Sequence, residues 1–190
     1  MLSNAILGYN CIMIKLTAKD LRTTKGNPEV IKTLKKNPIY IIVDNVLDTY
    51  NVGAIFRLAD ATAVQKVILC GETETPPHTR IKKASINTTE WVNWEYKETA
   101  LLAISDLRKR VANIQIVSVE LDKKAVSYDK FEYKLPVALI VGHESDGVSK
   151  EVLNASDAIV ELPMLGVNKS LNVMVSLGIV LYQVIGKIGK

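Results

Sequence analysis

Arg57 is the side chain of this sequence that most clearly requires a chemical explanation. It lies in the stretch DTYNVGAIFRLADA, where its immediate neighbours are apolar. A guanidinium stays charged and is rarely buried alone, so this arginine is expected to meet an anion or to line a cleft. A salt bridge to Asp60 or Asp44 is the competing explanation. Asn51, earlier in the same stretch, is of a type that caps helices, and capping explains it about as well as a functional role.

A second candidate is the glycine-bounded loop in PVALIVGHESDGVS. Gly142 and Gly147 have the spacing of the glycines in a phosphate-binding P-loop, but Val148 follows where that loop has its lysine. The loop also carries Glu144 and Asp146, whose charges repel a triphosphate. An ATPase or GTPase is therefore disfavoured, and the absence of a G-x-G-x-x-G pattern disfavours a dinucleotide site as well.

The same loop contains His143 next to Glu144 and Ser145. A catalytic triad needs side chains that converge, usually from separate segments, so His143 is interpreted as a loop residue. The other histidine, His78, lies in a Pro-rich turn, and no metal site is expected. The cysteines Cys11 and Cys70 are too few for a disulfide scaffold, which favours a reducing, cytoplasmic setting.

The third candidate is the C-terminal stretch ELPMLGVNKSLNVMVSLGIVLYQVIG. We expect Ser170 to cap a helix here and Asn172 to lie inside it, where a buried amide needs a partner. The helix is apolar on nearly every side and must be covered on every side, so a homodimer interface is predicted. Its apolar run is too short and too polar to span a membrane.

The elements that position these residues alternate along the chain from residue 39. Runs such as IYIIV and VALIV do not alternate apolar with polar residues, which predicts strands buried on both faces. The fold class is therefore α/β, a parallel sheet with helices on each side. The predicted strands are Ile39–Val43, Lys66–Cys70, Ile114–Val119, Pro136–Val141 and Ala158–Leu162; the predicted helices are Val52–Ala61, Glu98–Val111, Val148–Asn154 and Leu171–Ile185.

Ligands of open parallel sheets bind beyond the carboxyl ends of the strands. That rule selects three loops, Glu120–Lys124, Gly142–Gly147 and Pro163–Ser170. Glycine lets the backbone approach a small molecule closely, so the second loop is the strongest candidate.

The basic residues are concentrated at the N-terminus. Residues 1–40 carry seven Lys/Arg and two Asp/Glu, whereas the other 150 carry 17 and 18. We therefore divide the chain into a short basic segment, residues 1–38, and one domain, residues 39–190. The segment fits either an arm that meets phosphates or a solvated helix, Pro28–Lys36, capped by Asn27, and both interpretations stay open. No secretory signal is expected.

The candidate segments resemble a known family. NVGAIFR, IVGHESDGVS and LPMLGVNKSLNV are similar, in the same order, to the three signature motifs of the SpoU/TrmH branch of the SPOUT RNA methyltransferases. The resemblance implies a SPOUT fold with a deep C-terminal trefoil knot, which ordinary folding rules disfavour. It also implies a homodimer, S-adenosylmethionine as methyl donor, and the 2′-hydroxyl of a ribose in tRNA or rRNA as acceptor.

The resemblance assigns roles residue by residue. Arg57 is the principal catalytic candidate; because a guanidinium holds its proton very tightly, electrostatic stabilisation of the developing alkoxide is easier than literal base catalysis. Asn51, Glu144, Ser170 and Asn172 are implied to position it and the substrate. The implied contacts to the donor are Val119, Gly142, Leu162, Met164 and Leu171. No metal is needed for transfer from a sulfonium.

Two further interpretations remain. Arg80, Lys82, Lys83, Trp91 and Trp94 are candidates for RNA contact, although the two tryptophans are more often core residues. A catalytically silent RNA-binding or assembly protein with the same fold is the alternative function, disfavoured by the intact set of motif residues. Base methylation is disfavoured by the arginine and the Ser-Leu-Asn motif.

Overall fold

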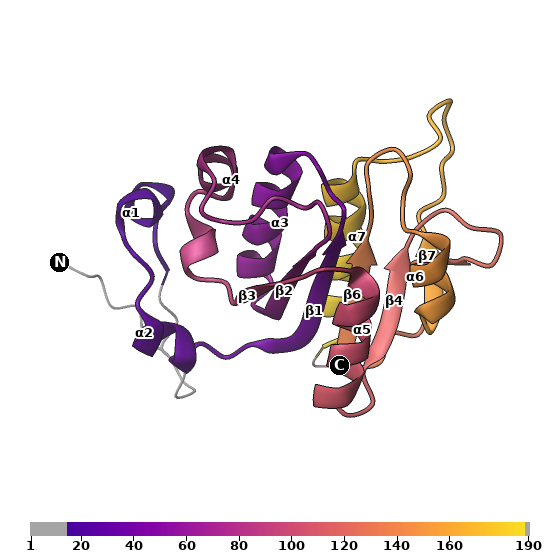
Figure 1. Cartoon of the computed structure of the whole chain (residues 1–190), viewed down its shortest axis with the longest axis horizontal. Helices are drawn as coiled ribbons and strands as arrows, with labels where there is room; N and C mark the ends of the chain where they lie inside the picture. The colour runs from indigo at the N-terminus through magenta and orange to yellow at the C-terminus, as the bar shows by residue number, and fades with distance from the viewer. Residues whose placement is uncertain (1–14, 189–190) are drawn as a thin grey trace.

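A seven-stranded parallel sheet forms the centre of the protein, in a computed structural model that describes residues 15–188 (Figure 1). Every strand pair is parallel, and the strand order is β3-β2-β1-β6-β4-β7-β5. The parallel sheet inferred from the sequence is confirmed. The strands are β1 (Asn37–Asp44), β2 (Val64–Cys70), β3 (Trp94–Lys97), β4 (Gln115–Val119), β5 (Val126–Ser127), β6 (Val137–Val141) and β7 (Ala158–Glu161).

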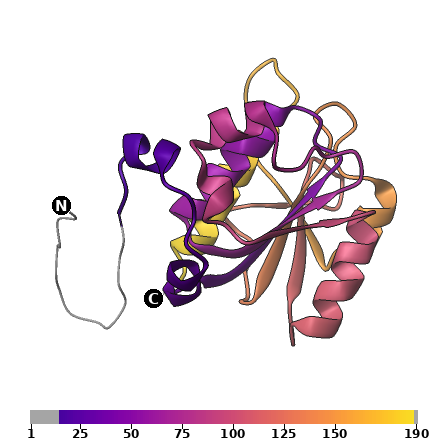
Figure 2. The ribbon, with the colours of Figure 1, turned by 60° about the vertical axis from the view of Figure 1, so that its left-hand side comes forward.

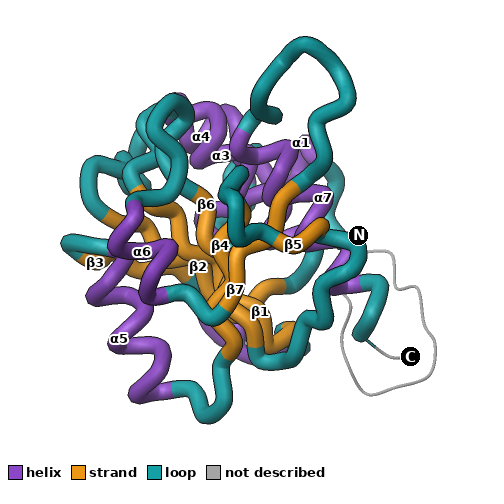
Figure 3. The backbone as a smooth tube through the Cα atoms, turned by 90° about the vertical axis from the view of Figure 1, so that its right-hand side faces the viewer, coloured by secondary structure: helices purple, strands orange, loops and turns teal. Residues whose placement is uncertain are grey.

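Helices cover both faces of this sheet (Figure 3). Helices α3 (Thr49–Ala61), α4 (Thr79–Ser85) and α7 (Val173–Ile185) lie on one side, and α5 (Ala100–Arg110) and α6 (Lys150–Ala155) on the other. Two short helices, α1 (Ala18–Thr23) and α2 (Pro28–Thr33), lie at the periphery, as Figure 2 shows.

Side chains of consecutive residues in the central strands pack in different hydrophobic cores, one on each face of the sheet. Ile41 of β1 packs in the cluster that contains α3 and α7, whereas Ile42 packs in the cluster that contains α5. Successive strand side chains point to opposite faces, so apolar residues at both positions are what a doubly covered strand requires. This is why the apolar runs of the sequence do not alternate.

The sequence prediction missed the short elements. Strands β3 and β5 and helices α1 and α4 were not expected, and α2 ends at Thr33 rather than Lys36. Asn27 caps α2 as predicted, its side chain accepting from the amide of Glu29. The missed strands have four and two residues at the sheet edges, too few for a hydrophobic pattern to stand out.

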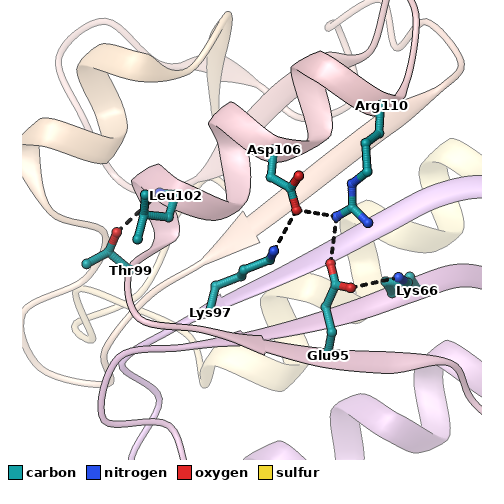
Figure 4. A network of polar contacts seen from close by, with 7 residues as sticks. All are labelled: Lys66, Glu95, Lys97, Thr99, Leu102, Asp106 and Arg110. Atoms are coloured by element: carbon teal, nitrogen blue, oxygen red, sulfur yellow. Dashed lines mark hydrogen bonds and ion pairs between the residues drawn. The ribbon is translucent and has the colours of Figure 1, made fainter.

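A chain of ion pairs joins β2, β3 and α5 (Figure 4). Glu95 accepts from Lys66 and Arg110, each at 2.8 Å, and Asp106 pairs with Arg110 and with Lys97. Because β3 is one of the two edge strands of the sheet, these pairs attach an otherwise weakly held edge to the helix that covers it.

The two tryptophans are core residues rather than exposed stacking platforms. Trp91 is buried, and Trp94 is partly buried with its ring edge-on to Phe56.

Cys70 is also buried, which raises the pKa of its thiol to about 12; Cys11 lies outside the described residues. Within residues 15–188, no helix has the length and apolar character needed to cross a bilayer.

Candidate active site

A cavity of about 370 Å³ opens at the carboxyl ends of β4, β6 and β7. Its walls come from the segments that follow these strands, residues 119–121, 141–147 and 161–173, with Ser176 of α7. The three loops selected from the strand pattern therefore meet at one place. The reason is the parallel sheet, which brings the carboxyl ends of adjacent strands to the same edge.

Glu144, in the loop after β6, joins this cavity to the start of α3. Its carboxylate accepts from the backbone amides of Leu47, at 3.1 Å, and Asp48, at 3.0 Å. It also accepts from the side-chain amide of Asn51 at 2.9 Å. Burial by itself raises the pKa of Glu144, but these three donors outweigh it and hold the pKa below the ordinary value. Glu144 is thus an ionised acceptor at neutral pH.

Asn51 continues the connection to α7. Its side-chain oxygen accepts from Nδ2 of Asn172 at 3.0 Å, so one amide bridges Glu144 and Asn172. Asn51 is buried in the first turn of α3, and Asp48 caps that helix, so the expectation that Asn51 is a cap is wrong. Its partners lie 93 and 121 residues away in sequence, which local pattern could not reveal.

Asn172 and Ser170 each lie one step earlier relative to the helix than expected from the sequence. Asn172 is the N-cap of α7, its oxygen accepting from the amides of Met174 and Val175, and it does not lie inside the helix. Ser170 therefore does not cap α7; it lines the cavity from the preceding loop. Both residues are exposed in the single chain.

Close backbone contact explains the two glycines of the loop after β6. A Cβ on Gly142 would lie 2.4 Å from the carbonyl of Gly147, so no larger residue fits there. Gly147 has a φ of +67°, and a Cβ there would lie 2.2 Å from the carboxylate of Glu120. That carboxylate also accepts from the amide of Val148 at 2.8 Å, fastening one loop to the next.

Glu120 is a site residue that the sequence reasoning did not single out. It is the first residue after β4 and lines the cavity. The available signal was its place at the start of a loop already selected from the strand pattern. No side-chain motif marks it, because its partner Val148 contributes only a backbone amide.

The lining combines apolar and acidic side chains. The five implied donor contacts, Val119, Gly142, Leu162, Met164 and Leu171, all line the cavity. Three carboxylates line it as well, those of Glu120, Glu144 and Glu161, and no lysine or arginine is among the lining residues of the described chain. Such a cavity suits a ligand with an apolar part and a positive charge.

Arg57 is not part of this cavity within one chain. It lies on the exposed side of α3, about 9 Å along the helix axis from Asn51 at the usual helical rise. In the described part of the chain it forms no ion pair with Asp44 or Asp60, so the salt-bridge explanation is not supported.

His143 is a loop residue, as the sequence suggested. Its Nδ1 accepts from the backbone amides of Ser145 and Asp146, at 3.1 and 3.2 Å, and its own backbone pairs with Gly147. The imidazole thus holds the tight turn of the loop. Because Nδ1 accepts from amides, we interpret the 3.4 Å contact between His143 and the Asp146 carboxylate as proximity rather than an ion pair.

Comparison with known proteins identifies the family. A model of the SpoU rRNA methylase family matches residues 38–182, which include all three candidate motifs. The chain belongs to this family. The cavity, the bridged pair of helices and the exposed arginine are therefore features of a SpoU rRNA methylase family member.

Characterised relatives of this SpoU family chain modify RNA. The tRNA (guanosine(18)-2′-O)-methyltransferase of Aquifex aeolicus is 33% identical over 161 residues, covering 82% of this chain and 72% of that protein. The 23S rRNA (guanosine-2′-O-)-methyltransferase of Ralstonia nicotianae is 26% identical, covering 83% of this chain and 62% of that protein.

Solved structures share the fold. The A. aeolicus TrmH/SpoU tRNA modifying enzyme superposes with a TM-score of 0.70 at 30% identity, over 87% of this chain and 79% of that chain. An AdoMet-bound rRNA methyltransferase from Sinorhizobium meliloti gives a TM-score of 0.72 at 27% identity, over 90% of this chain and 61% of that chain.

Proposed function

We propose that this protein transfers a methyl group from S-adenosylmethionine to the 2′-hydroxyl of a ribose in tRNA or rRNA. The observation that carries the proposal is the hydrogen-bonded series Glu144–Asn51–Asn172, which joins all three family motifs at the edge of one cavity. The relatives named for ribose 2′-O-methylation of tRNA and rRNA support the reaction class.

The cavity fits the proposed donor. Val119, Leu162 and Leu171 offer apolar surface for an adenine ring, and Gly142 lets backbone groups approach it. The three lining carboxylates favour the positive charge that distinguishes a sulfonium donor from its neutral thioether product. When bound, the donor supplies an electrophilic methyl group.

The remaining chemistry falls to residues that activate the ribose oxygen. A ribose hydroxyl is a poor nucleophile, and the guanidinium of Arg57 stabilises the negative charge that develops on it. The hydrogen bonds among Glu144, Asn51 and Asn172 fix the loop after β6 against the first turns of α3 and α7. Ser170 contacts the substrate nucleotide from the cavity wall.

A second copy of the chain brings Arg57 to the cavity in this proposal. Helix α7 buries one side, whereas Val175, Ile179 and Tyr182 form an exposed stripe on the other. The loop leading to α7 exposes Leu165 and Val167 almost completely. An exposed apolar surface of this kind indicates a protein interface, and a twofold homodimer covers both copies at once.

The activity is tested with purified protein, bulk tRNA or rRNA, and methyl-labelled donor. Nucleoside digestion should give label in 2′-O-methylated ribose, and label only in bases would refute the reaction class. Arg57→Ala should retain donor binding by calorimetry and lose transfer by about 10²-fold or more, in the range of lost oxyanion stabilisation.

Mixed dimers test which copy supplies the arginine. Arg57→Ala chains are combined with Gly142→Val chains, whose added side chain cannot fit beside Gly147. If Arg57 acts on the partner's cavity, the mixed dimer regains activity at the one intact cavity. If it acts on its own cavity, the mixture stays as inactive as either parent.

A further inference from the structure

A second cavity, of about 400 Å³, lies between the N-terminal segment and α4, away from the candidate active site. We name it the basic cleft and define it by its lining residues Arg22, Thr79, Lys82, Lys83, Ile86 and Asn87. Arg22 comes from α1, whereas the two lysines come from α4. The basic N-terminal segment and the basic stretch near residue 80 thus meet at one place.

The three cations of the basic cleft have no acidic partner in residues 15–188. All three side chains are exposed, and within the described chain no carboxylate lines the cleft and none of the three forms an ion pair. Asp20, the acid of α1, is engaged by Thr17 in the helix cap. Clustered cationic side chains bind polyanions because binding releases the counterions that surround the polyanion.

Asn87 holds the two halves of the cleft together. Its Nδ2 donates to the carbonyls of Leu21, at 2.9 Å, and Thr24, at 3.1 Å, on either side of Arg22. The residue is 5% exposed, and its backbone has a φ of +66°, a conformation that favours glycine. An asparagine at this position strains the backbone more than a glycine would. Its side chain makes two hydrogen bonds that fix α1 against the segment that follows α4.

Helix α4, which carries the two lysines of the basic cleft, packs against α3 with its other face. A Cβ on Gly53 would lie 2.6 Å from Ala84 and 2.7 Å from the carbonyl of Ile81, so α3 and α4 pack backbone to backbone. Arg57 is four residues after Gly53 and therefore on the same side of α3, one turn further along. The exposed arginine and the cleft lie on adjoining helices.

We propose that the basic cleft binds the phosphodiester backbone of the RNA substrate, at a distance from the nucleotide that is methylated. This inference rests on the proposed function, since the RNA bound in the cleft is the substrate on which Arg57 acts. The contacts are charge interactions with phosphates, so the cleft adds affinity and orientation without reading base identity.

The test compares RNA binding of wild type, Lys82→Ala/Lys83→Ala and a control, Lys109→Ala/Lys150→Ala, whose exposed lysines lie on α5 and α6. Fluorescence anisotropy with bulk tRNA and with rRNA fragments is measured at several salt concentrations. The cleft variant should bind RNA about 10-fold more weakly. The plot of log binding constant against log salt concentration should be less steep by about 1.5, as expected for two lost phosphate contacts. The control should match wild type. Donor affinity and the circular dichroism melting curve should be unchanged.

A second variant tests the tether. Asn87→Gly keeps the backbone conformation and removes the bonds to α1, so it should weaken RNA binding about as much as Arg22→Ala. The double variant Arg22→Ala/Asn87→Gly should be no weaker than either single change, because both remove the same contact. Full additivity would contradict the role of Asn87.

The outcomes separate this inference from the proposed function. Wild-type transfer to RNA together with unchanged RNA affinity and KM in the cleft variant overturns the cleft and leaves the function standing. Absence of both RNA binding and transfer in wild type overturns both. Loss of binding to anionic vesicles or an acidic peptide, with RNA binding intact, assigns the cleft to another partner and also overturns the inference.

Discussion

Glu144 and Glu120 have different environments although both line the same cavity. Glu144 accepts three hydrogen bonds, and its pKa is lowered below the ordinary value, so it stays ionised and holds the start of α3. Glu120 accepts from the backbone amides of Val148 and Leu121 and lies beside Gly147, at the end of the glycine-bounded loop. We interpret Glu144 as a positioning residue and Glu120 as a charge that faces the cavity and fastens this loop to the segment after β4.

Glu120→Gln should weaken binding of the cationic donor more than binding of its neutral product. A unit charge at about 4 Å in a hydrated site contributes about 1 kcal/mol, which corresponds to roughly fivefold in the donor Kd. The product Kd should change less than about twofold, because glutamine still accepts from Val148. Calorimetry with both ligands measures this, and Asp122→Asn, outside the cavity, is the control. Equal weakening of both ligands contradicts an electrostatic role.

At the scale of elements, α3 and α7 are joined where both begin. Asn172 caps α7 with its oxygen and donates to Asn51 of α3 with its nitrogen, so one side chain has two separable functions. The contact places the start of α7, and with it the preceding loop, against the cavity.

Substitutions at position 172 should separate these functions. Asn172→Ala removes the cap and should lower the free energy of unfolding by about 1 kcal/mol. Asn172→Asp keeps the cap but cannot donate, and its charge repels the oxygen of Asn51, so it should melt near wild type and lose methyl transfer. Melting curves and transfer rates together decide the matter. Wild-type activity in Asn172→Asp means that the contact to Asn51 is dispensable.

The ion pairs on β3 should make stability depend on pH in a defined direction. Burial tends to raise the pKa of Glu95, but bonds from Lys66 and Arg110 outweigh it and lower the pKa. The contribution is therefore complete above the unfolded-state pKa, about 4.3, and disappears as pH falls through the lower folded-state value.

Glu95→Gln should accordingly reduce the free energy of unfolding by roughly 1 kcal/mol at pH 7, as expected for partly exposed pairs in a network. The difference from wild type should shrink as pH falls below about 4.3 and vanish once pH has passed below the lower folded-state pKa of Glu95, where the wild-type carboxylate is protonated. Urea unfolding at several pH values measures it. Glu98→Gln is the control, since Glu98 is exposed and makes no ion pair in the described chain. A pH-independent difference would refute the assignment.

At the scale of the whole molecule, charge is divided between two regions. The candidate donor cavity is lined by carboxylates, and the basic cleft by cations, on separate parts of the surface. A cationic donor and a polyanionic RNA therefore each meet a surface of complementary charge. The acidic cavity by itself repels RNA, which is a physical reason for Arg57 to be supplied from outside it.

Ile179→Glu tests the proposed dimer. Ile179 is 36% exposed on α7, so a charge there is tolerable in a single chain but is costly when a second copy covers it. Light scattering should show a monomer in place of a dimer, with methyl transfer reduced by at least an order of magnitude. Leu101→Glu, exposed on α5 at the opposite face, should stay dimeric and active. A monomeric and fully active wild type would end the dimer proposal.

The sequence by itself determined the layered fold and the location of the site. Runs such as VALIV require two covering layers, and parallel strands bring three glycine- and polar-rich loops to one edge, so both followed from local pattern. The SpoU resemblance added the family, which the family match confirms. The trefoil knot that it implies remains a prediction.

Only the tertiary structure decided which side chains touch. Asn51 bridges Glu144 and Asn172, Asn172 replaces Ser170 as the cap, and Arg22 meets Lys82 and Lys83 across the basic cleft. It also placed Arg57 outside the cavity of its own chain. The spacing of apolar residues along a segment predicts which of its faces are buried. A hydrogen bond between residues distant in sequence depends on how whole helices and strands pack, and no local sequence pattern contains that information.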